Sequence, residues 1–375
     1  MTVSSTSPSA SGAGPSNSEL LKLRQVHVSG DPRALGRGQG EALRPVIVAF
    51  VEQRLQALRA YMEERKAGSV EAFLALGAEC LRIAQAWDPA GTSEHLGIAE
   101  GAGVDATSLY AVANMTDVRD VLLLPPPLED EGCTSFVLPK HLSADGLVVA
   151  GQTWDLNPDD LDYVVAIHRR PSEGPETWSV TCAGCLSLVG MNEHGLAVGT
   201  TNIKARATQP GVGYMSLLHR AIRERTRELA AESIRSAPRA AAHTYWIADA
   251  GGGLEIEATA RHAVVRRADE VALARTNHCI APEVLALQGE ATTSSSLARL
   301  ARATKVLSQG KHDLESLRAL FADRTDGVDS INRYPEDAQG TTTNSCVLAW
   351  PERRLLWACR GPADRGEWVV LPFGS

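Results

Sequence analysis

The chain has 375 residues, of which 44% are hydrophobic and 22% charged, a composition typical of a globular protein that can bury a core of its own. Its formal net charge of −8, with no basic stripe, argues against nucleic acid and anionic membranes as partners. It contains no run of about 18 apolar residues, the length that would span a bilayer.

The first residues are rich in Ser, Gly and Pro and lack the basic start and apolar stretch of a signal peptide. We therefore predict a disordered tail over residues 1–20 and a cytoplasmic protein. The seven cysteines are irregularly spaced and odd in number, which fits reduced thiols better than a disulfide framework.

The part of the chain before residue 122 is predicted to be mostly helical. Residues 22–29 alternate in polarity, which indicates a short strand, and Asp31 followed by Pro32 is typical of a helix start. Apolar residues at helical spacing predict further helices over residues 43–62, 70–87 and 106–120.

Residues 122–132 are rich in proline and acidic residues and form the main break in the chain. They are either a plain connection or an exposed segment that can be processed. After residue 132, apolar residues recur at every second position, which is the period of β-strands. Strands are predicted over residues 134–138, 147–154, 162–168, 178–182, 186–191, 196–201, 243–248, 254–258, 345–350, 355–359 and 368–371.

Helices are predicted in this second part over residues 214–236, 294–307 and 314–321. In the first of them, Met215, Leu218, Ile222 and Leu229 are expected on one packed side. Asp145 and Gly146 indicate a hairpin turn between the first two strands. Helices before, within and after a block of strands favour an α+β fold, with helices on both outer faces of two packed antiparallel sheets.

Cys133 is the strongest candidate nucleophile. A thiol reacts readily near neutral pH, and Gly132 has no Cβ to obstruct attack on its own carbonyl carbon. Such an attack would give a thioester, and water would then release Cys133 as a new N-terminus. An α-amine, with a reference pKa of about 8, can take the thiol proton without a histidine. The alternative is a buried cysteine with a purely structural role.

Three polar residues distant in sequence are candidate partners of Cys133. The predicted hairpin returns Asp155 roughly opposite Cys133, where it would orient the new ammonium or the thiol, unless it is a solvated turn residue. Asn277 can donate its amide to a developing oxyanion, unless it is a turn asparagine. Arg299, early in a predicted helix, would pair with Asp155 or hold the substrate, unless it is an exposed helix arginine.

The other motifs are weaker evidence for a functional site. Cys182 and Cys185 have the spacing of a zinc or redox pair, but zinc needs two more ligands and no second pair follows, so Cys182 is expected in a core. His278 is either a base or a structural hydrogen-bonding residue. The glycines from Gly36 to Gly40 open a helix without matching a phosphate-binding pattern. The sequence therefore predicts no metal site and no prosthetic group.

Several stretches together resemble the acyl-coenzyme A:6-aminopenicillanate (isopenicillin N) acyltransferase family, over about residues 22–372. The matching stretches are residues 28–40, 98–103, 131–135, 151–155, 190–196, 276–278 and the helix start that carries Arg299. Gly-Cys-Thr-Ser followed by Gly-Gln-Thr-Trp-Asp is the most specific combination. Thr153 and Leu156 depart from the asparagine and the aromatic residue usual in the family, which puts the substrate in question more than the chemistry.

The resemblance implies a cysteine-type N-terminal nucleophile hydrolase with a four-layer αββα sandwich. It implies self-cleavage between Gly132 and Cys133, with Cys133 as nucleophile, Asp155 as its orienting carboxylate and Asn277 as oxyanion donor. Arg299 corresponds to the helix arginine of the family.

Self-cleavage would divide the chain into an α piece, residues 21–132, and a β piece, residues 133–375, which stay associated as one unit. Thr134 and Trp154, beside the nucleophile and its carboxylate, are predicted to contact the substrate.

The predicted function is cleavage or exchange of an amide bond in a small N-acyl amine or short peptide, through an acyl-thioester on Cys133. Water as acceptor gives hydrolysis and a bound amine gives transfer, and both remain open. Coenzyme A enters only as part of a substrate, in the alternative of an acyl-CoA-dependent N-acyltransferase. A further alternative is an uncut binding protein without catalysis.

Overall fold

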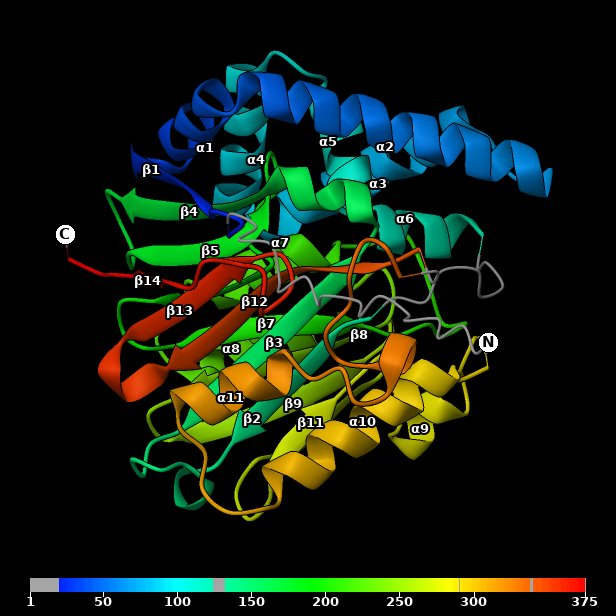
Figure 1. Ribbon diagram of the computed structural model, residues 1–375. Helices are drawn as coiled ribbons and strands as arrows, with labels where there is room; N and C mark the ends of the chain where they lie inside the picture. The colour runs from blue at the N-terminus through cyan, green and yellow to red at the C-terminus, as the bar shows by residue number, and fades with distance from the viewer. Residues whose placement is uncertain (1–19, 124–131, 290, 338–339, 375) are drawn as a thin grey trace, which may run out of the picture.

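The computed structural model describes residues 20–123, 132–289, 291–337 and 340–374. The predicted tail, apart from Leu20, and most of the predicted acidic loop therefore lie outside the described residues. Figure 1 shows two sheets stacked on one another, with blue to cyan helices above them and yellow to orange helices below. This arrangement confirms the predicted α+β fold with helices on both outer faces of two packed sheets.

Six helices come from the first third of the chain: α1 (Pro32–Ala42), α2 (Arg44–Arg65), α3 (Val70–Trp87), α4 (Pro89–Ala102), α5 (Ala106–Ala113) and α6 (Met115–Leu122). As predicted, Asp31 caps α1, because its carboxylate accepts a hydrogen bond from the Ala34 amide at 2.8 Å. The single helix predicted over residues 106–120 is wrong. The chain breaks at Asn114, whose side-chain oxygen accepts from the backbone amide of Met215 at 3.2 Å.

The sequence did not predict α4, which packs along α1 at very short range. A Cβ on Gly36 would lie 1.9 Å from the carbonyl oxygen of Glu94, and a Cβ on Gly97 would lie 2.3 Å from that of Arg33. Glycine weakens a helix on its own, so the helical signal of α4 is low, and the close packing against α1 stabilises it instead. The glycines near Gly36 thus serve contact between helices.

The larger sheet has eight strands in the order β1 (Arg24–Gly30), β4 (Val164–Pro171), β5 (Thr177–Cys182), β6 (Val189–Asn192), β7 (Ala197–Asn202), β8 (His243–Asp249), β9 (Gly252–Ala258) and β10 (Ala263–Arg267). All neighbours pair antiparallel as predicted, except β1, which lies parallel to β4. The sequence did not predict β10.

The helical region between β7 and β8 consists of α7 (Tyr214–Ala221) and α8 (Arg227–Ser236), so the single helix predicted over residues 214–236 is wrong. Thr226 caps α8 by accepting from the Leu229 amide at 3.3 Å, which starts a new helix axis. Met215, Leu218 and Ile222 are buried as expected. Leu229 was predicted on the same side but is 52% exposed. It lies in α8, which starts a new axis after Thr226, so Leu229 no longer follows the helical spacing of Met215, Leu218 and Ile222.

The smaller sheet has six strands in the order β11 (Leu273–Arg275), β2 (Thr134–Leu138), β3 (Val149–Leu156), β12 (Thr342–Trp350), β13 (Leu355–Arg360) and β14 (Val369–Leu371). Three helices follow β11: α9 (Pro282–Leu285), α10 (Ser294–Leu307) and α11 (Leu314–Phe321). Strand alternation separates two cores. Val137 faces the core between the sheets, whereas Phe136 packs with Phe321 of α11 on the outer side.

The pairing of β2 with β3 sets the geometry of the candidate site. Thr134 lies opposite Thr153, so the start of β2 and the end of β3 meet at one end of the sheet. The connection between them is longer than the predicted tight turn, because it contains a 3₁₀ turn at Lys140–Leu142 before Asp145. Gly132 precedes β2 and donates its amide to the Asp155 carbonyl at 3.5 Å.

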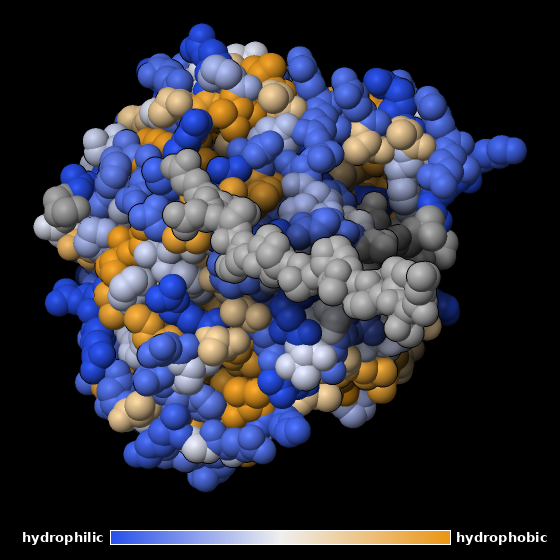
Figure 2. All heavy atoms as spheres, viewed as in Figure 1, coloured by the Kyte–Doolittle hydropathy of each residue, from blue (hydrophilic) through white to orange (hydrophobic). Residues whose placement is uncertain are grey.

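Figure 2 shows charged and polar residues over most of the visible face, with smaller apolar areas between them. Within the described ranges, no helix has both the length and the apolar character needed to cross a membrane.

Candidate active site

Cys133 lies immediately before β2 and is only 6% exposed. Its carbonyl oxygen accepts a hydrogen bond from Arg299 Nη1 at 2.5 Å. Gly132, on the other side of the bond predicted to be cut, is pressed against two side chains. A Cβ at this position would lie 2.6 Å from Asp155 Oδ2 and 2.9 Å from Arg333 Cζ. Glycine is therefore required here for close approach, in addition to the open carbonyl expected from the sequence.

Asp155, at the end of β3, is fully buried and lies beside Gly132. It is thus one residue out of register from the position opposite Cys133 that the sequence suggested, although both residues line the same cavity. Burial raises the pKa of Asp155 to about 6, and the nearby guanidinium groups of Arg333 and Arg299 counter this only in part. A carboxyl with such a pKa can exchange a proton near neutral pH.

We expect the Asp155→Asn substitution to reveal this pKa as a dependence of stability on pH. Between about pH 4 and 6 the folded wild-type carboxyl stays protonated while the unfolded one ionises. Wild-type stability is therefore lost as pH rises through this window, and the Asn variant is spared the loss. Its advantage should grow by about 2 kcal/mol from pH 4 to pH 7.

Urea unfolding measures this difference, with Cys133→Ala present in both proteins so that each unfolds as one chain. The matched variant Asp269→Asn, at an exposed aspartate, controls for loss of a surface charge. An unchanged stability difference across the window would contradict the raised pKa of Asp155.

Arg299 lies in the second turn of α10 and is fully buried, so it is not an exposed helix arginine. It connects the nucleophile segment to the predicted oxyanion donor. Besides the Cys133 carbonyl, its Nη1 donates to Thr134 Oγ1 and its Nη2 to Asn277 Oδ1, both at 3.0 Å. Its Nε donates to Ser295 Oγ at 3.2 Å. The guanidinium group therefore fixes three segments that are far apart in sequence.

Asn277 lies after β11 and beside the start of α10, where its backbone amide donates to Ser296 Oγ at 3.0 Å. Its side-chain nitrogen donates to the Asn202 carbonyl at 3.0 Å, which uses one of its two N–H groups, so the second can donate to an oxyanion. His278 Nδ1 lies 2.8 Å from Ser296 Oγ, which fits the structural alternative for this histidine.

The two residues predicted to contact substrate differ in position. Trp154 lines the cavity beside Cys133. Thr134 is buried against Arg299, and its hydroxyl serves that hydrogen bond.

Sequence reasoning missed Arg333, the cation that approaches Asp155 most closely. Its Nε lies 4.0 Å from Asp155 Oδ2, and both side chains are fully buried. Arg333 also donates to Thr341 Oγ1 at 2.6 Å and to Ser295 Oγ, which accepts from Arg299 as well. No motif surrounds Arg333 in the sequence, and only the fold brings it to Asp155.

A narrow cavity of about 30 Å³ opens beside Cys133, large enough for a small group. It is lined by Thr116, Cys133, Trp154, Asp155, Leu156, Leu188, Thr200, Asn202, Tyr214 and His243. Its walls come from α6, β3, β7, α7 and β8, so the helical first part of the chain and both sheets build it together.

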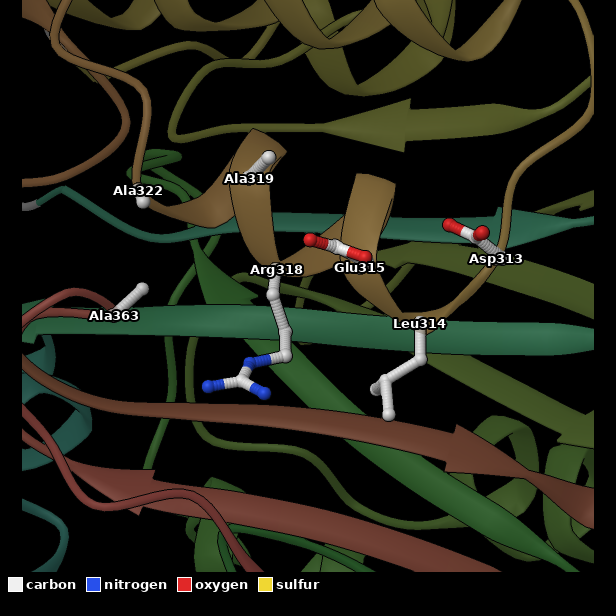
Figure 3. A pocket seen from close by; sticks show the side chains of 7 residues that line it. All are labelled: Asp313, Leu314, Glu315, Arg318, Ala319, Ala322 and Ala363. Atoms are coloured by element: carbon white, nitrogen blue, oxygen red, sulfur yellow. The ribbon is translucent and has the colours of Figure 1, made fainter.

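A hollow of about 60 Å³ shares Thr116 and Leu156 with this cavity. Larger hollows that share none of its lining residues lie elsewhere. One of about 650 Å³ lies at the start of α11 (Figure 3), where Asp313, Glu315 and Arg318 lie at its edge. Asp313 there caps α11 by accepting from the Ser316 amide at 2.9 Å. Another, of about 410 Å³, contains Glu94 and Arg169, which form an ion pair at 2.6 Å.

Cys182 and Cys185 are buried and free, and the strand pattern correctly predicted Cys182 in a core. In the parts of the chain that the structure describes, no three His, Cys, Asp or Glu side chains are grouped to hold a metal ion.

Comparison with known proteins gives one family match. The model of the family described as acyl-coenzyme A:6-aminopenicillanic acid acyl-transferase matches residues 142–363, a range that includes Asp155, Asn277 and Arg299 and begins after Cys133. No curated protein sequence matches the chain.

Among solved structures, penicillin V acylase from Agrobacterium tumefaciens is similar with a TM-score of 0.44 and 16% identity, over 64% of this chain and 86% of that chain. A single-residue variant of conjugated bile acid hydrolase from Clostridium perfringens is similar with a TM-score of 0.45 and 13% identity, over 64% of this chain and 97% of that chain.

Proposed function

Because this chain belongs to the acyl-coenzyme A:6-aminopenicillanic acid acyl-transferase family, we propose that it is an amidohydrolase or acyl transferase whose acyl-carrying nucleophile is the thiol of Cys133. The family match confirms the resemblance inferred from the sequence. The proposed substrate of this protein is a small N-acyl amine or a short peptide. An acyl-CoA serves as acyl donor in the transferase alternative.

The first step is self-cleavage. Cys133 Sγ attacks the carbonyl carbon of Gly132, the C–N bond breaks, and the thiol proton ends on the α-amine of Cys133. Water then hydrolyses the resulting thioester, which leaves a carboxylate on Gly132 and a free thiol on Cys133. In turnover the same thiol attacks the substrate amide, and the α-amine passes its proton to the departing amine. Water or a second amine completes the reaction by taking the acyl group from Sγ.

The observation that supports this proposal most is the set of contacts of Arg299. One guanidinium group binds the carbonyl oxygen of Cys133 and the side-chain oxygen of Asn277, while Asp155 lies against Gly132. A nucleophile, a carboxylate able to hold a proton and an amide donor are thus within one buried cluster. Asp155 would orient the new ammonium group, and Asn277 would donate to the oxyanion of the tetrahedral intermediate.

Buried polar contacts support the proposal that the two pieces stay associated after the cut. Glu94 of α4 forms an ion pair with Arg169 of β4 at 2.6 Å, and Asp117 Oδ1 of α6 lies 2.5 Å from His243 Nε2 of β8. Separating the pieces would expose these groups and the apolar core that α1 to α5 share with the larger sheet.

Intact mass measurement of the purified protein tests the proposal. We expect two masses that meet at Gly132 and Cys133 in place of one mass near 40.0 kDa, together with turnover of N-acyl 4-nitroanilides. N-terminal sequencing should read Cys133-Thr134-Ser135. A single full-length chain that cleaves amides would refute the N-terminal mechanism, and a single chain without turnover would favour the binding-protein alternative.

A further inference from the structure

His243 lies in the wall of the cavity beside Cys133, and only one of its ring nitrogens contacts a polar group among the described residues. It is 2% exposed, and its Nε2 lies 2.5 Å from Asp117 Oδ1. No described residue hydrogen-bonds to His243 Nδ1 or to the hydroxyl of Thr116, which lines the same cavity. Buried polar atoms without partners are rare and call for a ligand or a water molecule.

The contacts of Asp117 determine which nitrogen of His243 carries the proton. Its other oxygen, Oδ2, accepts from the backbone amide of Tyr214 at 2.7 Å. Because both carboxylate oxygens accept, His243 donates from Nε2, and in the neutral imidazole Nδ1 is then a bare acceptor. The Tyr214 ring stacks on the imidazole at 4.6 Å between centroids and 20° between planes, which fixes its orientation.

The acyl part of a substrate is the part that this cavity would hold. The acyl group takes part in both half-reactions, because it is first transferred to the thiol and then released from it. The amine departs at the end of the first. The cavity is narrow and lined by Cys133 itself, with Trp154, Leu156 and Leu188 as apolar walls. A short acyl group with a small apolar body therefore fits these walls.

We infer that the cavity selects acyl groups that carry a hydroxyl, which donates to His243 Nδ1 and accepts from the Thr116 hydroxyl. A hydroxyl satisfies both unpartnered atoms, whereas an ammonium group cannot accept and a methyl group does neither. The inference rests on the proposed function, since it requires the acyl group to be attached to Cys133.

The test compares N-acyl 4-nitroanilides whose straight acyl chains end in a methyl, a hydroxyl or a methyl ketone, over a series of chain lengths. At the best length, kcat/KM should be at least about tenfold higher for the hydroxyl than for the methyl end, because hydrogen bonds to His243 and from Thr116 are gained. The ketone accepts from the Thr116 hydroxyl but cannot donate to Nδ1, so its kcat/KM should fall below that of the hydroxyl end.

Asp117→Asn should remove the advantage of the hydroxyl end over the ketone end. Its side-chain oxygen can keep the Tyr214 amide while its NH₂ donates to His243 Nε2, which moves the histidine proton to Nδ1. The ketone end, which then accepts from both Nδ1 and Thr116, should match the hydroxyl end. His243→Phe keeps a ring against Tyr214 and leaves only the hydrogen bond from Thr116, so the hydroxyl and ketone ends should also be equal there. His95→Phe is the matched control, because His95 is equally buried, bonds one carbonyl and packs on Tyr110 away from the cavity.

The outcomes separate the inference from the proposed function. Equal kcat/KM for the three chain ends in a processed, active wild type would overturn the inference and leave the proposed function intact. A preference for the hydroxyl over the ketone that survives both Asp117→Asn and His243→Phe would overturn the role of His243. An uncut chain that turns over none of the amides would overturn the proposed function itself, and the inference with it.

Discussion

Replacing Cys133 by alanine should abolish self-cleavage and lower amide turnover by a factor on the order of 10⁴ or more, because the nucleophile of both reactions is lost. The protein should purify as one chain near 40.0 kDa. Intact mass and the hydrolysis of N-acyl 4-nitroanilides measure the two effects. The side chain is small, so folding should be preserved, which circular dichroism can check.

Two further variants make this result specific. Cys133→Ser keeps an oxygen nucleophile in place and should slow processing and reduce turnover strongly without blocking cleavage outright. Cys182→Ala removes another buried thiol, one that does not line the cavity, and should leave both the cut and turnover in place. Processing and turnover in the Cys133→Ala chain would refute the mechanism, and their loss in Cys182→Ala would show a general effect of thiol removal.

Local signals in the sequence predicted much of the fold. Pro32 after Asp31 predicted the start of α1, and helical spacing predicted α3, α10 and α11 with their bounds. Most strands of the two sheets, though not β10 and β11, were found by their period of two, because each buries one face against the core and the other against helices or the second core.

What the sequence did not predict depends on tertiary contacts. The helix α4 is rich in glycine and forms because its backbone packs directly on α1. The break at Asn114 occurs where its side chain binds the backbone of α7, far along the chain. The strand β10 has mostly charged or partly exposed residues, and its pairing with β9 decides its structure.

In the candidate site, too, some residues could be predicted from the sequence and others are placed only by tertiary contacts. Cys133 and Asp155 are twenty-odd residues apart and joined by a predicted hairpin, so local pairing brings them near one another. Asn277 and Arg299 came from the family resemblance, and the structure brings them to within one hydrogen bond of each other. Arg333 reaches the site from a segment without any motif. Neither helix or strand propensity nor residue spacing predicts that Arg333 lies beside Asp155.

The Arg299→Met substitution should destabilise the protein by about 3 kcal/mol and lower turnover about 10²- to 10³-fold. Methionine fills similar space but donates no hydrogen bond, so the buried oxygens of Cys133 and Asn277 lose their donor, at about 1–3 kcal/mol each. Relief of the desolvation of a buried cation offsets part of this cost. Turnover falls further because the amide of Asn277 is no longer oriented toward the oxyanion.

Arg302→Met is the matched control, one turn farther along α10. Arg302 is 29% exposed and pairs with Asp323 at 2.5 Å, so its loss should cost no more than about 1 kcal/mol and leave turnover unchanged. Urea unfolding measures the stability of both variants, and kcat measured well below the unfolding transition separates catalysis from folding. If Arg299→Met were cut and turned over amides at the rate of Arg302→Met, Arg299 would be a structural residue only, and the contacts that support Cys133 as nucleophile would have to be sought in Asp155 and Arg333.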